Sequence, residues 1–171
     1  MGRDKALLPF KESKTLTQYQ INRVKNWFDS VYVSCKNRDK FDFEASFIED
    51  VKEFEAFSPL VAIYSVLDSL KSEVAILSVD TPFVTKEIFE KLYINSKNSE
   101  ATIAKSPFGS HQMCAIYKPS ILPVLKEQIK NDNHKIRELL KKVETKYIEF
   151  DEDLPFMNLN KIEDYEKALR S

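Results

Sequence analysis

The sequence predicts an α/β domain whose mostly parallel sheet carries helices on both faces. Short apolar runs alternate with amphipathic segments along the 171 residues, which is the pattern of strand–helix units. The run from Val74 to Val79 is almost continuously apolar, and such runs suit a strand that is covered on both faces. The length fits one hydrophobic core, so we expect residues 1–171 to form a single domain.

Apolar spacing and turn residues locate the individual elements. We expect helices at 15–29, 59–70, 85–96, 119–131, 134–143 and 162–169, and strands at 31–35, 46–49, 74–79, 101–105, 113–117 and 146–150. Pro59 suits the first turn of its helix, while Thr81 and Pro82 fit the N-cap and first position of the helix that follows the apolar strand.

The ends of three expected strands carry polar side chains, and together they define a candidate site. Ligands of open α/β sheets bind beyond the carboxyl ends of the strands. Ser34, Asp50 and Asp80 all lie at or near such ends. Because Mg²⁺ prefers one or two carboxylates together with phosphate oxygens and water, Asp80 is a candidate metal ligand. A helix cap is the alternative interpretation of this aspartate.

Composition excludes several classes of partner. The net charge of −1 gives no basic excess for nucleic-acid binding. No apolar run approaches the ~18 residues of a membrane span, and the N-terminus lacks the pattern of a signal peptide. Cys35 and Cys114 lie far apart in apolar stretches, as free core thiols do. We therefore expect a cytoplasmic protein with no nucleic-acid or membrane partner.

Four segments, in order along the chain, resemble signature stretches of the MobA-type nucleotidyltransferases. Met1 to Phe10 resembles the end of the family's signature loop, and Asp50 followed by Ser58-Pro59-Leu60 resembles its Asp and Gly-Pro-Leu region. Val79 to Phe83 resembles the metal-binding Asp-x-Pro segment, and Phe156 to Tyr165 resembles the terminal Asn-x-Asn segment. The resemblance covers the whole chain.

This resemblance implies both a fold and a reaction. The fold is a Rossmann-like nucleotidyltransferase domain of the nucleotide-diphospho-sugar transferase type. The reaction transfers GMP from GTP to molybdopterin and releases pyrophosphate, which gives molybdopterin guanine dinucleotide, with Mg²⁺ as the cofactor. GTP and molybdopterin are the implied substrates. Molybdoenzymes, their chaperones and other molybdenum-cofactor proteins are implied as further partners.

The resemblance also assigns roles to particular residues. Lys5 and Asp80 are the catalytic pair, with Lys5 on the GTP phosphates and Asp80 on Mg²⁺. The residues implied on the GTP side are Lys5, Ser34, Asp50 and Asp80. The residues implied on the molybdopterin side are Asn158, Asn160, His111 and Arg137. An exposed or purely structural role is the alternative for His111 and Arg137.

The sequence departs from the family at its start. In the family, a strand and a glycine-rich loop precede the Met-Gly-x-Asp-Lys segment, whereas this chain begins at Met1 and holds only two glycines, Gly2 and Gly109. We therefore expect the sheet to lack its first strand, so that neighbouring strands expose unpaired backbone groups and apolar faces. We also expect the natural protein to begin upstream of Met1, and this chain to bind GTP poorly and turn over little.

Two alternatives to the guanylyltransferase stay open. One is a related nucleotidyltransferase that uses CTP or a sugar-phosphate acceptor, because the absent loop is the part that largely reads the base. The Asn158-Leu159-Asn160 segment favours the guanine enzyme. The other is a non-catalytic, cofactor-binding homologue, against which the presence of Lys5, Asp50 and Asp80 argues.

Overall fold

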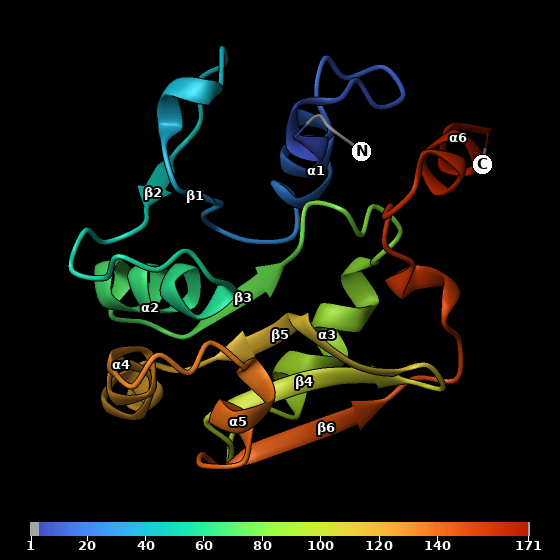
Figure 1. The fold of residues 1–171 in the computed structure, drawn as a ribbon. Coiled ribbons are helices and arrows are strands. Elements are labelled where there is room, and N and C mark those ends of the chain that lie inside the picture. The colour runs from blue at the N-terminus through green and yellow to red at the C-terminus, as the bar shows by residue number, and fades with distance from the viewer. Residues whose placement is uncertain (1–3, 171) are drawn as a thin grey trace.

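The computed structural model describes residues 4–170, so the first residues of the Met1 to Phe10 segment lie outside the described part. The helices are α1 Leu16–Val24, α2 Pro59–Leu70, α3 Lys86–Ile94, α4 Leu122–Lys130, α5 Ile136–Leu140 and α6 Ile162–Arg170 (Figure 1). The strands are β1 Val33–Cys35, β2 Phe47–Glu49, β3 Val74–Leu77, β4 Ala101–Ser106, β5 Gly109–Tyr117 and β6 Thr145–Glu149. Short 3₁₀ turns lie at Lys5–Leu7, Arg38–Lys40, Pro119–Ile121 and Leu154–Phe156.

The main sheet has four strands in the order β3-β5-β4-β6. β5 is antiparallel to both β3 and β4, and β4 is parallel to β6. Strands β3, β4 and β6 therefore run in one direction, as a mostly parallel sheet requires, and β5 is the exception. The carboxyl ends of these three strands lie at the same edge of the sheet.

Two separate hydrophobic cores confirm that helices cover both faces of this sheet. Alternate residues of β5 point to opposite faces. Ala115 and Tyr117 pack with residues of α2, α4 and α5. Cys114 and Ile116 pack with residues of α3. Burial raises the pKa of the Cys114 thiol to about 12, and both cysteines are free and buried as expected.

The helix boundaries confirm most of the expected elements and correct one cap. Helix α2 spans the expected residues, with Ser58 as its N-cap. The prediction that Thr81 caps the next helix is wrong, because α3 begins at Lys86 with Thr85 at its N-cap position. The Thr81 hydroxyl instead donates to the carbonyl of Ser78 at 2.9 Å. It therefore closes the turn after β3 rather than starting a helix.

The strands β1 and β2 form a second, parallel sheet that stands apart from the main one (Figure 1). Within residues 4–170, β1 pairs with β2 alone and β3 pairs with β5 alone. Ala75 of β3 is exposed, and Ile76 and Leu77 are only half-buried. Within the described residues, the facing edges of β1 and β3 therefore have no strand partner, and part of their apolar surface is uncovered. No helix in the described part of the chain is long and apolar enough to cross a membrane.

Candidate functional site

The loop after β3 holds Asp80 at the carboxyl edge of the sheet. The Ser78 hydroxyl donates to Asp80 Oδ1 at 2.5 Å and so fixes the carboxylate. The Gln20 side-chain amide, on α1, lies 3.3 Å from the carbonyl oxygen of Ser78 and 3.2 Å from those of Val79 and Thr81. Since Gln20 is itself buried, these bonds attach the loop firmly to α1.

Lys5 and Asn160 reach the same loop from the two ends of the chain. Lys5 Nζ lies 3.9 Å from Asp80 Oδ2 and donates to Asn160 Oδ1 at 2.9 Å. Two further bonds hold the approaching segments in place. The Thr17 hydroxyl donates to the carbonyl of Ala6 at 2.8 Å, and the Leu159 N–H donates to the carbonyl of Asp80 at 2.9 Å. We refer to Lys5, Asp80 and Asn160 as the cation–carboxylate cluster.

The chemistry of this cluster suits a metal ion bound together with a phosphate group. Asp80 Oδ2 is beyond hydrogen-bond distance from the lysine, and 22% of the Asp80 side chain is exposed. No group of three or more His, Cys, Asp or Glu residues that could hold a metal occurs within residues 4–170. The protein thus supplies one hard oxygen ligand, and Mg²⁺ commonly completes such a set with substrate phosphates and water.

Asp50 and Ser34 lie on the smaller sheet. Asp50 follows β2, and its N–H donates to the carbonyl of Cys35 at 2.9 Å. Its Oδ1 is buried without a hydrogen-bond partner. Burial raises the pKa of this carboxyl, and the charge of Lys36 opposes the shift. A buried acceptor without a partner is costly, so Asp50 is suited to accept a hydrogen bond from a ligand. Ser34 is exposed within β1.

His111 belongs to a second polar group, which joins the β4–β5 hairpin to the segment before Asn160. His111 lies within β5, and its Nε2 is 2.7 Å from the Ser106 hydroxyl oxygen. Ser106 donates to Asp153 Oδ1, which also accepts from the Phe108 N–H at 3.0 Å. Since the one Ser106 proton goes to Asp153, the His111 Nε2–H is the donor to Ser106. We name His111, Ser106 and Asp153 the hairpin anchor.

Aromatic stacking completes the hairpin anchor. The His111 ring stacks on Phe156 with 4.2 Å between ring centroids and 8° between planes. Burial lowers the pKa of His111, against the charge of Asp153. Sequence reasoning missed Ser106 and Asp153, because 47 positions separate them and no spacing pattern connects them. The acidic run Asp151-Glu152-Asp153, shortly after the last strand, was the only available signal.

The remaining expected residues divide between the two ends of the sheet. Asn158 is exposed, between Phe156 and the Leu159 that bonds to the Asp80 loop. Arg137 is exposed on α5, which leads into the amino end of β6. Because the cation–carboxylate cluster lies at the carboxyl edge, the structure does not bring Arg137 to it.

Comparison with known proteins matches these features to a family. The sequence model of the MobA-like NTP transferase domain matches residues 1–147. The molybdenum cofactor guanylyltransferase of Campylobacter jejuni is 40% identical over 98% of this chain and 87% of its own length. The enzyme of that name from Helicobacter pylori is 32% identical over 98% of this chain and 82% of its own length.

A solved structure supports the fold. The crystal structure of molybdopterin-guanine dinucleotide biosynthesis protein A from Archaeoglobus fulgidus superposes with a TM-score of 0.84, covering 99% of this chain and 90% of that one. At 22% sequence identity, this similarity concerns the fold alone. From the family match and the curated relatives, the chain belongs to the MobA-like NTP transferase domain family and is an enzyme of the nucleotidyltransferase type.

Proposed function

We propose that this chain transfers GMP from GTP to molybdopterin and releases pyrophosphate, so that molybdopterin guanine dinucleotide is formed. The curated relatives carry the guanylyltransferase activity in their names. The observation that carries the proposal is the cation–carboxylate cluster. Lys5, Asp80 and Asn160 come from three distant parts of the chain and meet at the carboxyl edge of the sheet, where nucleotides bind in such folds.

The main barrier to this reaction is the repulsion between two anions. A terminal phosphate oxygen of molybdopterin attacks the α-phosphorus of GTP, and the bond to the pyrophosphate leaving group breaks. The attacking phosphate is already ionised, so the protein need supply neither a nucleophile nor a general base. Alignment of the two substrates and neutralisation of their charge are the remaining tasks. The Lys5 ammonium performs the second task on the triphosphate, as a mobile point charge.

Asp80 is the residue that would hold a divalent metal. Nucleotidyltransferases of this family generally use such an ion, and we propose Mg²⁺. The fit rests on the Asp80 carboxylate, whose Oδ2 makes no hydrogen bond to Lys5 and whose side chain is 22% exposed. When bound, the ion neutralises charge on the triphosphate as pyrophosphate departs.

The other site residues bind the two substrates. Asp50 accepts a hydrogen bond from the nucleotide through its buried, unpartnered oxygen. Ser34 lies on β1, which pairs with the strand β2 that ends just before Asp50. Asn158 and Asn160 line the molybdopterin side, with His111 holding their segment through Phe156. Arg137 has no part in this proposal, because it lies toward the other end of the sheet.

The cellular setting follows from the same proposal. Molybdoenzymes, their chaperones and other molybdenum-cofactor proteins are the expected recipients or donors of the cofactor. The two free, buried thiols support a reducing compartment, which we take to be the cytoplasm.

The test is single-turnover catalysis with the enzyme in excess over molybdopterin. GTP, CTP or ATP is supplied with Mg²⁺, and the products are identified by mass spectrometry. We expect the guanine dinucleotide and pyrophosphate from GTP, and no dinucleotide from the other two. A cytosine dinucleotide in place of the guanine one would assign the enzyme to the CTP branch. A parallel reaction supplies a sugar phosphate in place of molybdopterin. Product in that reaction, with none from molybdopterin, would show that molybdopterin is not the acceptor.

A further inference from the structure

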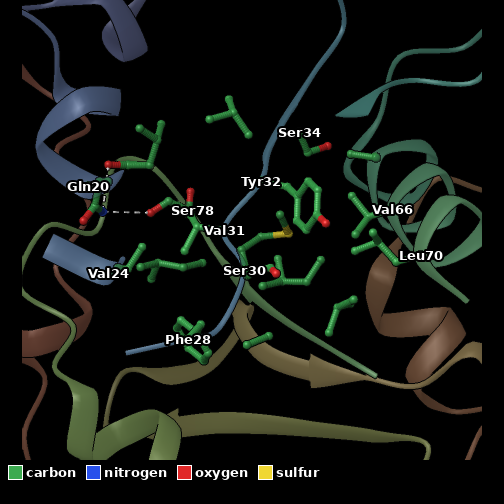
Figure 2. Close-up of a pocket in the computed structure, with 18 of the residues that line it drawn as sticks. Gln20, Val24, Phe28, Ser30, Val31, Tyr32, Ser34, Val66, Leu70 and Ser78 are labelled. Atoms are coloured by element: carbon green, nitrogen blue, oxygen red, sulfur yellow. Dashed lines mark hydrogen bonds between the residues drawn. The ribbon is translucent and has the colours of Figure 1, made fainter. Parts of the chain in front are cut away.

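Gln20 and Arg23 lie about one turn apart on α1 and bond to the loop that carries Asp80. Gln20 and Ser78 both line a cavity of about 680 Å³ between β1 and β3. Figure 2 shows the Gln20 side chain pointing from the helix toward Ser78, with a dashed line for the bond between them. Gln20 is 7% exposed, so its amide has to be satisfied by the protein itself.

The amide nitrogen of Gln20 bonds to the backbone on both sides of Asp80. Nε2 lies 3.3 Å from the carbonyl oxygen of Ser78 and 3.2 Å from those of Val79 and Thr81. Because an amide group carries two protons, three carbonyls share them and are drawn toward one point. These bonds restrain the peptide groups immediately before and after the aspartate.

Arg23 determines which end of the Gln20 amide faces the loop. Arg23 Nε and Nη2 donate to Gln20 Oε1 at 3.1 Å and 2.6 Å. A guanidinium only donates and a backbone carbonyl only accepts, so the amide between them has one satisfactory orientation. Hydrogen bonds from a charged donor are also stronger than neutral ones. They polarise the amide and so strengthen its own bonds to the loop.

Arg23 is itself held in place and reaches further along the same loop. Its Nη1 donates to the carbonyl of Val84. The guanidinium carbon lies 4.9 Å from the centroid of the Trp27 ring and 5.9 Å from that of the Tyr19 ring. Within residues 4–170, Arg23 forms no ion pair with a carboxylate. Its charge therefore acts on Gln20 and on the loop.

Ser78 transmits the position of Gln20 to the carboxylate. The Ser78 carbonyl accepts from Gln20, and the Ser78 hydroxyl donates to Asp80 Oδ1 at 2.5 Å. A displacement of Ser78 would therefore move the Asp80 side chain directly. Since Asp80 is the one carboxylate proposed for the ion, no other side chain of the proposed site would compensate for such a displacement.

We propose that Gln20 and Arg23 are positioning residues for the metal-binding carboxylate of Asp80. Between them they bind four backbone carbonyls of residues 78–84, so the loop presents the carboxylate in one arrangement before a metal arrives. In this role neither side chain contacts the ion. The proposal rests on the metal role of Asp80 in the proposed function. Partners that orient a metal ligand commonly change the metal affinity by about 10–100-fold.

The experiment measures Mn²⁺ binding at Asp80 by NMR spectroscopy of the isotope-labelled 171-residue chain. Mn²⁺ suits the same oxygen ligands as Mg²⁺, and it broadens the amide signals of nearby residues such as Thr81. The measured quantity is the Mn²⁺ concentration that broadens the Thr81 signal by half. Mn²⁺ alone is the probe, so the result does not depend on nucleotide binding.

Gln20→Glu is the informative variant. It keeps the size of the side chain and the acceptor for Arg23, but it replaces the donor to the three carbonyls with an oxygen. Asn22→Asp makes the same amide-to-carboxylate change at an exposed position of α1 and is the matched control. We expect Gln20→Glu to require about tenfold more Mn²⁺, and Asn22→Asp to match the unaltered chain.

A double variant separates positioning from stability. Gln20→Met with Arg23→Met removes both polar groups together, and such paired replacements can leave the stability nearly unchanged. We expect a similar loss of Mn²⁺ affinity with a thermal unfolding midpoint close to that of the unaltered chain. A pair with a purely structural role would change the midpoint and leave the affinity for Mn²⁺ as it is. This variant also gives a result if Gln20→Glu does not fold.

Two results would overturn the proposal, and an Asp80→Asn variant distinguishes them. Equal Mn²⁺ affinity in Gln20→Glu, the double variant and the unaltered chain, with no broadening in Asp80→Asn, would exclude the positioning role alone. Broadening that persists in Asp80→Asn, or is absent from the unaltered chain, would remove the metal role of Asp80 and with it the proposal.

Discussion

At the scale of single residues, Asp50 combines a buried, unpartnered oxygen with a raised pKa. A raised pKa in the folded state means that ionisation opposes folding, so this carboxyl lowers stability as the pH rises through its pKa. We predict that Asp50→Asn stabilises the apo protein by about 1 kcal/mol at pH 7, and that the gain disappears below about pH 4. Denaturant unfolding at both pH values checks it. An equal gain at both would rule out the ionisation as the cause.

Asp80 is predicted to act through its charge rather than through its packing. Asp80→Asn keeps an acceptor for the Ser78 hydroxyl but removes the negative charge from the proposed metal ligand. We expect the loss of Mg²⁺-dependent product with an unchanged thermal unfolding midpoint. Asp68→Asn, at an exposed ion pair with Lys71 on α2, is the matched control and should retain activity. Activity in Asp80→Asn would remove Asp80 from the metal role.

Lys5 is predicted to contribute mainly to binding of the triphosphate. Lys5→Ala should weaken GTP binding by roughly 1.5–3 kcal/mol, the usual contribution of one charge-assisted hydrogen bond. Titration calorimetry in Mg²⁺ buffer measures the change. Lys86→Ala, which removes an exposed partner of Glu90 on α3, should leave the affinity as it is. A GTP affinity unaltered by Lys5→Ala would contradict the assignment.

At the scale of elements, the hairpin anchor connects the β4–β5 hairpin to the segment that ends at Asn160. Asp153→Ala leaves the Ser106 hydroxyl and the Phe108 N–H without their acceptor. We expect a loss of about 1–3 kcal/mol of stability and faster tryptic cleavage after Lys161. Asp151→Ala, in the same loop and exposed, is the control. Equal cleavage rates in the two variants would show that Asp153 does not hold this segment.

The sequence predicted these elements where a local pattern encodes them. The apolar run of β3 and the Pro59-led helix α2 were found within two residues of their ends. The direction of β5 was not predictable, since alternation along a strand does not record which way its neighbours run. The prediction that Thr81 is the N-cap of α3 was wrong, because the Thr81 hydroxyl donates to the carbonyl of Ser78 in the preceding turn. Lys5, Asp80 and Asn160 were each predicted, but only the folded chain shows that they meet.

At the scale of the whole molecule, we expect the division into two sheets to weaken the site. Residues of both sheets and Gln20 line one cavity, and Gln20 also bonds to the loop after β3 that carries Asp80. We predict that the 171-residue chain binds GTP weakly and forms product slowly. Steady-state assays of pyrophosphate release check this prediction. Turnover at ordinary enzyme rates, on the order of 10 per second, would refute it.

The bond between Lys5 and Asn160 joins positions 155 apart in sequence. A ribosome therefore has to make nearly all of the polypeptide before the two can meet. All four strands of the main sheet precede Asn160 in the chain, so we expect a polypeptide that ends before this residue to contain the main sheet but not the bond from Lys5.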